Sequence, residues 1–68
     1  MTFTLWLKSQ HERKDAIGDL ARSIADDKHV PDGEARLAHW KEHLEDRRAG
    51  PGAFRALDEA WREYGVLH

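Results

Sequence analysis

Residues 52–65 read Gly52-Ala53-Phe54-Arg55-Ala56-Leu57-Asp58-Glu59-Ala60-Trp61-Arg62-Glu63-Tyr64-Gly65. Large apolar side chains recur in this stretch at steps of three, four and three residues, at Phe54, Leu57, Trp61 and Tyr64. That spacing is the period of one face of a helix. Gly65 follows where a helix would end. The stretch therefore predicts an amphipathic helix that closes a small core.

Upstream, the same periodicity predicts two short helices. Thr2 can cap a helix over residues 3–10, and Asp15 can cap a second helix that ends in the mid-twenties. The second helix has the cleanest apolar face of the chain, formed by Ile17, Leu20, Ala21, Ile24 and Ala25. We expect both faces to contribute to one core.

A break separates these helices from a third one. Pro31 disfavours helix at the residue before it, and Asp32 can cap the next helix. We expect this third helix over residues 33–48, with Gly50 as its stop and Pro51 near the start of the fourth helix. Residues 66–68 are predicted to be a frayed tail.

No stretch alternates apolar and polar residues as a strand does. The fold class is therefore all-α, a compact array of four to five short helices in a single domain, residues 1–68. The predicted core comprises Phe3, Trp6, Leu7, Ile17, Leu20, Ile24, Leu37, Trp40, Leu44, Phe54, Leu57 and Trp61. Because the chain has only 68 residues, these large side chains must supply most of its stability.

Composition narrows the functional classes. The net charge of −2 gives no general attraction to nucleic acid. The chain has no cysteine, which fits a reducing compartment and removes thiolate metal ligands. Residues 1–7 lack the features of a secretory signal, and no apolar run approaches a membrane span. We expect a cytoplasmic protein that does not enter a membrane.

Four pieces of sequence occur in an order that resembles a known family. They are Phe3-x-x-Trp6-Leu7, Asp15-x-Ile17-Gly18-Asp19-Leu20-Ala21, Asp26-Asp27-Lys28-x-x-Pro31 and Leu57-Asp58-Glu59-Ala60-Trp61-x-x-Tyr64. Together they resemble the YozE-like family of small bacterial and phage proteins, whose fold is similar to the sterile alpha motif (SAM-like). Leu57 stands where that family commonly has phenylalanine. Residues 32–48 match only in their apolar spacing.

The resemblance implies a fold and no reaction. SAM-like domains act as protein–protein modules that often self-associate, and a minority bind RNA hairpins. The resemblance therefore implies a non-catalytic interaction module without a cofactor, with a protein partner or a second copy favoured. Residues for such contact are an acidic surface that includes Asp26, Asp27, Asp32 and Glu34, an opposite surface with Arg55, and a terminal apolar patch of Tyr64, Val66 and Leu67.

A compact basic cluster offers an alternative function. Lys8, His11, Arg13 and Lys14 fall at the end of the first helix and in the following connector. Such a cluster could contact phosphates of RNA or DNA. Glu12 and Asp15 interrupt it, and a charged connector is commonly just solvated. We therefore rank nucleic-acid binding second.

Residues 39–43 contain a literal H-x-x-E-H, the pattern of inverted zinc peptidases. Histidines at i and i+4 share a helix face and can bind one zinc ion. A peptidase also needs a third protein ligand and a substrate cleft. At about 100° per residue, His39 and His43 point away from the Leu37/Trp40/Leu44 stripe toward water. We therefore predict exposed histidines and no metal site.

Overall fold

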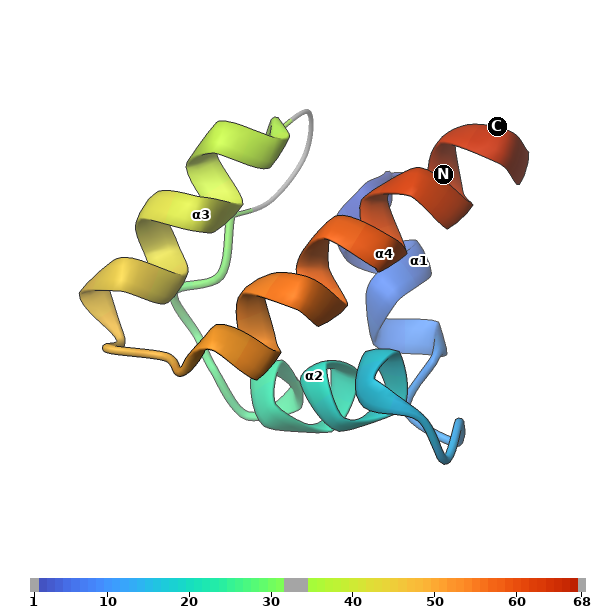
Figure 1. Cartoon of the computed structure of the whole chain (residues 1–68), viewed down its shortest axis with the longest axis horizontal. Coiled ribbons are helices and arrows are strands. Elements are labelled where there is room, and N and C mark those ends of the chain that lie inside the picture. Colours follow the sequence, from blue (N-terminus) through green and yellow to red (C-terminus); the bar gives the residue numbers. More distant parts are fainter. Residues whose placement is uncertain (1, 32–34, 68) are drawn as a thin grey trace.

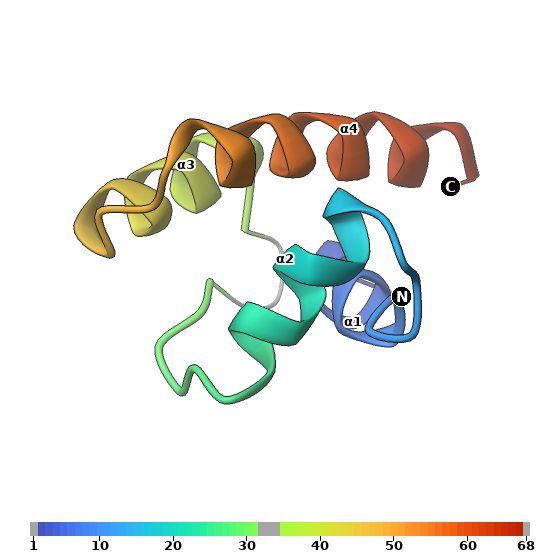
Figure 2. The same ribbon diagram turned by 60° about the horizontal axis from the view of Figure 1, so that its bottom comes forward.

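The computed structural model describes residues 2–31 and 35–67, without the side chain of Leu67. Its helices are α1 (Phe3–Ser9), α2 (Ala16–Ala25), α3 (Leu37–Asp46) and α4 (Pro51–Leu67), and the described residues form no strand. Figures 1 and 2 show α3 and α4 side by side in one layer, with α1 and α2 packed beneath α4. The predicted all-α fold is confirmed.

Side-chain caps set the first two helices, as the sequence predicts. The Thr2 hydroxyl accepts a hydrogen bond from the Leu5 N–H at 3.2 Å. The Asp15 carboxylate accepts one from the Gly18 N–H at 3.0 Å. Each cap satisfies a backbone donor that has no partner inside its own helix. The first helix ends at Ser9, one residue before the predicted end.

The third helix is shorter than predicted at both ends. It begins at Leu37 after the N-cap residue Arg36, so the prediction of residues 33–48 is wrong in its bounds. Asp32, the predicted cap, lies outside the described residues. The Arg36 N–H donates to His39 Nδ1 at 3.0 Å. A histidine side chain thus satisfies the backbone at the start of this helix.

The residue that ends α3 is Arg48, not the predicted Gly50. Arg48 has a φ of 55°, in the left-handed region. Its N–H donates to Glu45 O at 3.0 Å, and the Ala49 N–H donates to Leu44 O at 2.9 Å. These two bonds form a Schellman motif, which needs its left-handed residue directly after the C-cap. Gly50 comes two residues too late to serve.

The last helix continues past its predicted end. It runs from Pro51 to Leu67 through Gly65, so Gly65 is not a stop and residues 66 and 67 are helical rather than frayed. A glycine inside a helix costs about 1 kcal/mol relative to alanine but keeps its backbone hydrogen bonds. The apolar face over residues 54–64 is long enough to keep the chain helical through Gly65.

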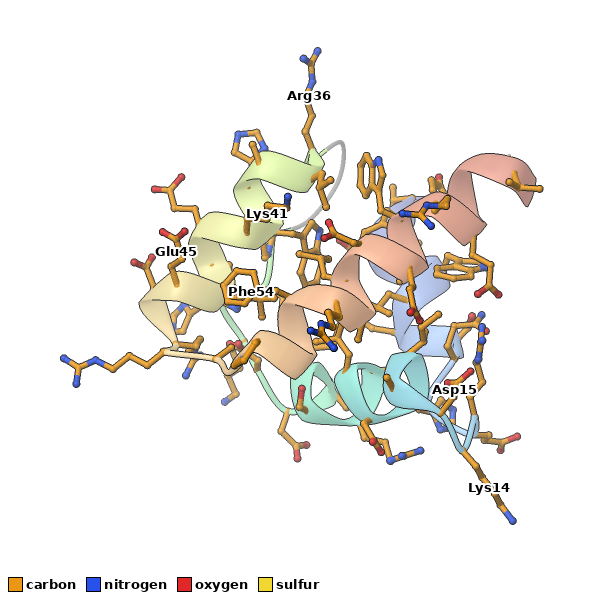
Figure 3. The ribbon with its side chains drawn as sticks, viewed as in Figure 1. Lys14, Asp15, Arg36, Lys41, Glu45 and Phe54 are labelled. Atoms are coloured by element: carbon orange, nitrogen blue, oxygen red, sulfur yellow. The ribbon has the colours of Figure 1, made fainter. Side chains whose placement is uncertain are left out.

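The core contains most of the predicted large side chains together with three alanines, of which the sequence placed only Ala21 on an apolar face. The buried apolar residues are Phe3, Trp6, Leu7, Ile17, Leu20, Ala21, Ile24, Trp40, Leu44, Ala56, Leu57 and Ala60. Leu37, Phe54 and Trp61 are only partly buried. Figure 3 shows Phe54 between α3 and α4. Alanines on α2 and α4 suit a close helix–helix approach, because side-chain size at the contact sets the interaxial distance.

Phe3 joins the aromatic residues of three helices. Its ring centroid lies 4.7 Å from that of Trp61, 5.6 Å from Trp40 and 5.5 Å from Tyr64. The edge-to-face and tilted geometries are those that aromatic pairs prefer. Beside Phe3, the buried Thr4 hydroxyl donates to Pro31 O at 2.6 Å. The short first helix is therefore held by its neighbours rather than by its own length.

In the described part of the chain, none of the helices is both long enough and apolar enough to span a membrane.

Candidate functional site

A groove of about 500 Å³ lies where the C-terminal ends of α2 and α3 meet the start of α4. We call it the α2–α3 groove. Its lining residues are Leu20, Ser23, Ile24, Asp26, Asp27, Lys28, His29, His43, Leu44, Arg47, Ala49 and Ala53. Apolar side chains from α2, α3 and α4 thus share it with charged side chains.

The floor of the groove is part of the core. Leu20, Ile24 and Leu44 belong to the buried cluster and are reached from the groove. A second hollow of about 370 Å³ shares Leu20, Ser23 and Ala53 with it. This hollow follows α2 back to Ala16 and is bounded across from α2 by Gly52 and Ala56. The residues on the α4 side of this hollow, Gly52, Ala53 and Ala56, are all small.

One edge of the groove is fixed by a network centred on Asp27. His43 Nε2 lies 2.8 Å from Asp27 Oδ2, and Arg47 Nη2 donates to Asp27 Oδ1 at 2.5 Å. The His29 N–H donates to the same oxygen at 2.9 Å. The hydrogen bond from this N–H, followed by those from His43 and Arg47, lowers the pKa of Asp27 to about 2. The side chains of Asp27 and His43 are only 10% and 11% exposed.

The network changes the expected acidic surface. Asp27 lies at the groove, but its carboxylate is engaged by partners within the chain. Asp26 is exposed and has no ion pair or hydrogen bond from its side chain to another described residue. Asp32 and Glu34 lie outside the described residues. Of the four predicted acids, only Asp26 is placed as an accessible charge.

The H-x-x-E-H histidines separate to different partners. His39 is exposed, as predicted, and its Nδ1 accepts from the backbone of Arg36. His43 does not face water, and that prediction is wrong, because its ring turns to Asp27 and packs edge-on against Trp40. Within residues 2–31 and 35–67, no three histidine, cysteine or carboxylate side chains converge as ligands for a metal ion.

The groove also shows how its one hydroxyl group is used. Ser23 Oγ donates to the Leu20 carbonyl at 2.9 Å within α2. The ring of His43 bonds to Asp27 instead of a hydroxyl. A nucleophilic serine needs a base within hydrogen-bond reach. The described groove residues therefore do not form such a pair.

In the basic cluster, Arg13 has a structural task. Its Nη1 lies 2.7 Å from Glu63 Oε1 and its Nη2 lies 2.6 Å from Asp15 Oδ2. The two carboxylates raise the pKa of Arg13, and Arg13 in turn lowers the pKa of Asp15. Arg22 closes the same connector by donating to the carbonyls of His11 and Arg13 at 2.7 and 2.8 Å.

The other members of the cluster remain accessible. Lys8, His11 and Lys14 are exposed, and Figure 3 shows Lys14 pointing away from the body of the molecule beside Asp15. Lys8, His11 and Lys14 are thus accessible for a phosphate contact. Arg13 is instead held in ion pairs with Asp15 and with Glu63 on α4.

The remaining predicted contact residues do not gather at one place. Tyr64 is half-buried and packs against Phe3 and Trp6, with ring centroids 5.5 and 5.8 Å apart. It belongs to the core rather than to a terminal patch. Arg55 is exposed on α4 and is absent from the groove lining. The side chain of Leu67 lies outside the described residues.

Sequence reasoning missed most of the groove. Ser23, Ala49 and Ala53 carry no chemical signal, and their role arises only because α2, α3 and α4 converge around them. The spacing of Asp27, His43 and Arg47 is also not one that a motif search would find. His43 on α3 and Arg47, the C-cap residue of α3, are four positions apart, and both reach the carboxylate of Asp27 in the α2–α3 connection.

Comparison with known proteins identifies a family. Residues 2–65 match the family model described as "YozE SAM-like fold". A search of curated proteins and a search of solved structures each found no match.

Proposed function

The chain belongs to the YozE SAM-like family, and on that premise we propose that it is a non-catalytic, cytoplasmic module that binds another protein. The observation that carries this proposal is the α2–α3 groove, a hollow with an apolar floor beside a charged edge. The shared fold adds only analogy to this argument, because related folds host different functions.

The composition of the groove suits a helical protein segment. Protein interfaces combine an apolar centre with a polar rim, and the groove sets the partly buried Ala49 and Ala53 beside charged side chains. The second hollow has small residues on its α4 side, Gly52, Ala53 and Ala56. Small side chains let the backbone of a bound helix approach. An amphipathic helix laid along a groove is a common mode of peptide recognition.

Binding of RNA or DNA through residues 8–14 is the second candidate. Lys8, His11 and Lys14 are exposed there. Arg13 is engaged by Asp15 and Glu63, so a phosphate would have to compete with two carboxylates for it. The net charge of −2 adds no long-range attraction. These observations favour the groove over the connector.

Selection from a displayed library of amphipathic helical peptides tests the first candidate. Ser23 is exposed and lines both hollows, so Ser23→Arg places a long cation in the groove. Ala25→Arg is the matched control, because Ala25 is exposed on the same helix outside the lining. We expect selected peptides to bind the wild type and Ala25→Arg alike, and Ser23→Arg at least about tenfold more weakly. Peptides that bind all three chains equally would contradict the proposal.

Titration of the labelled protein with a pool of RNA and DNA hairpins, followed by amide NMR, tests the second candidate. Shifts confined to residues 8–14, removed by salt and by the Lys8→Glu and Lys14→Glu changes, would establish nucleic-acid binding in place of the groove proposal. We expect the spectrum to stay unchanged.

A further inference from the structure

The cap at the start of α3 uses a side chain that can be protonated. In a capping box, the residue three positions after the N-cap reaches back to the N-cap backbone N–H, and that residue is ordinarily glutamate or glutamine. His39 holds this position in α3, and its Nδ1 accepts from the Arg36 N–H at 3.0 Å. A glutamine acceptor would be the same at every pH, whereas the His39 acceptor exists only while Nδ1 carries no proton.

Protonation of His39 therefore opposes the cap in two ways. In a neutral ring that accepts at Nδ1, the proton is on Nε2, and a second proton goes to Nδ1. That nitrogen then meets the Arg36 N–H as one donor against another. The ring also becomes a positive charge in the first turn of a helix, where the helix dipole disfavours cations. Histidine changes its charge between about pH 5 and 8.

The first turn of α3 lies at the edge of the core. Leu37 is only half-buried, and His39 is exposed. The first fully buried side chain of the helix is that of Trp40. Figure 3 shows the Arg36 side chain pointing away from the body of the molecule. The turn thus depends on the His39 cap and on the backbone N–H groups of His39 and Trp40, which donate to Arg36 O at 3.0 and 3.2 Å.

The carboxylates around the start of α3 do not pair with His39 in the described part of the chain. On α4, which packs against α3, Asp58 pairs with Lys41 at 3.5 Å. Within α3, Glu42 is exposed three positions after His39 and forms no ion pair with another described residue. A positive charge on His39 therefore gains little to offset the loss of the cap.

The end of α3 responds to acid differently. His43, one turn after His39, bonds to Asp27 in the α2–α3 connection, and Arg47 bonds to the same carboxylate. Because these contacts and the His29 N–H lower the pKa of Asp27 to about 2, its carboxylate stays ionised well below neutral pH. A protonated His43 thus keeps its partner, and a charged donor strengthens such a bond.

We propose that the start of α3 is a pH-sensitive switch. Near neutral pH, the His39 ring caps the helix and residues 37–39 are helical. Below about pH 6, protonation of His39 removes the cap, and this turn unwinds while Asp27 still holds the end of α3. Unwinding exposes Leu37, which packs against the edge of the core. His39 is absent from the lining of the α2–α3 groove, so the switch is independent of the function proposed above.

Hydrogen exchange of the Trp40 amide tests the switch, because this N–H bonds to Arg36 O across the first turn. We compare wild type with His39→Gln, which keeps an acceptor and does not titrate, and correct each for its intrinsic exchange rate. At about pH 7.5 the two chains should match. At about pH 5 the wild-type amide should exchange about two- to thirtyfold faster than that of His39→Gln, the range expected for the loss of a helix cap.

Two comparisons locate the effect. The Arg47 N–H, which bonds to His43 O at the end of α3, should exchange equally in wild type and His39→Gln at both pH values. His11→Gln removes an exposed histidine of the α1–α2 connector and should behave as wild type throughout. Because His39 and His11 are both exposed, both variants should fold, and an unchanged far-UV spectrum checks this.

Three results would overturn this inference. The first is equal protection of the Trp40 amide in wild type and His39→Gln at about pH 5. The second is a faster exchange in acid that extends equally to the Arg47 amide, which would mean general loosening of the chain. The third is an imidazole NMR spectrum at about pH 8 that places the proton of neutral His39 on Nδ1, because that nitrogen could then not accept.

Discussion

Gly18 packs so closely against the backbone of Arg13 that a Cβ atom at residue 18 would lie 1.9 Å from the Arg13 carbonyl oxygen. Gly18 also donates its N–H to the Asp15 cap. The side chain of Arg13 meanwhile reaches Glu63 on α4. Residues 13–18 therefore form a corner in which backbone contact, helix cap and ion pair depend on one another, and a glycine is the residue that permits it.

Replacing Gly18 by alanine should strongly destabilise the fold. The added methyl group meets backbone atoms, which cannot move aside as a flexible side chain would. Overpacking of this kind costs about 1–3 kcal/mol, and we expect the upper part of that range in urea denaturation. Gly65→Ala is the control, since nothing lies within 4 Å of its added Cβ, and it should stabilise α4 by about 0.5–1 kcal/mol. A Gly18→Ala variant as stable as wild type would contradict the close contact.

Replacing Arg48 by glycine should stabilise the protein. Arg48 occupies the left-handed position of the α3 Schellman motif with a φ of 55°. The left-handed conformation costs a residue with a Cβ atom about 1–2 kcal/mol, and glycine avoids this cost. Glycine also makes the unfolded chain more flexible, which removes part of the gain in stability. We expect a net gain of about 0.5–1 kcal/mol in urea denaturation. Arg48→Ala should change little, and an equal gain from both variants would point to loss of the charge instead.

Replacing Arg13 by glutamine should destabilise the chain, because Arg13 joins the α1–α2 connector to α4 through Glu63 and to the Asp15 cap. Its side chain is 29% exposed, so we expect a loss of about 0.5–1.5 kcal/mol. Lys14→Gln, one residue away and exposed without an ion pair to another described residue, should stay within about 0.5 kcal/mol of wild type. Equal losses in thermal melts of both variants would rule out a special role for Arg13.

Acid should destabilise the protein through Asp27. The pKa of this carboxyl is about 2 in the folded chain, below its ordinary value of about 4 in an unfolded chain. The unfolded chain therefore takes up the proton first as the pH falls. The stability from ionised Asp27 is fully present above about pH 4 and is lost as the pH falls toward about 2. The lowered pKa of Asp15 adds to the same slope.

The Asp27→Asn variant separates this contribution. Its free energy of unfolding, measured in urea from neutral pH down to about pH 2, should be lower at neutral pH and fall less steeply on acidification than that of wild type. Asp26→Asn should keep the wild-type slope, because Asp26 has no partner among the described residues. A wild-type slope in Asp27→Asn would show that the contacts of Asp27 with the His29 N–H, His43 and Arg47 do not hold in solution.

Zinc should not bind through the H-x-x-E-H sequence. His39 Nδ1 accepts a backbone hydrogen bond, and His43 Nε2 is turned to Asp27. Binding of one ion by both rings would require breaking one of these contacts. We expect histidine NMR resonances to stay in place on addition of zinc up to one equivalent. Coupled shifts of both rings, lost in His39→Gln, would contradict this prediction.

Local features were predictable because their causes lie within a few residues. The side chains of Thr2 and Asp15 each cap a helix by accepting from a backbone N–H three residues further along. The apolar spacing of α1 and α2 predicts most of the core residues. The ends of α3 and α4 were less predictable, because glycine suggests a stop wherever it occurs. Gly65 stays helical because the apolar face of α4 packs along most of the helix. Arg48 adopts the left-handed conformation because it is the residue directly after the C-cap.

The candidate site was largely out of reach of the sequence. The lining of the groove includes small residues such as Ala49 and Ala53, which have no signature of their own. Asp27 was noted as an acid, but both side chains that bond to its carboxylate come from residues 16 and 20 positions away. The family resemblance gave the fold correctly and gave no position for a groove.

By itself, the sequence determined that the chain is helical, where most helices begin and which face of each is apolar, because these properties depend on neighbours within one or two turns. The tertiary structure alone decided what Arg13, Asp27 and His43 do. Arg13 pairs with Glu63, which lies 50 positions away in the sequence. His43 belongs to the H-x-x-E-H pattern, but its ring bonds to Asp27. Such pairs depend on the angles at which helices pack, and a pattern read along one helix does not contain those angles.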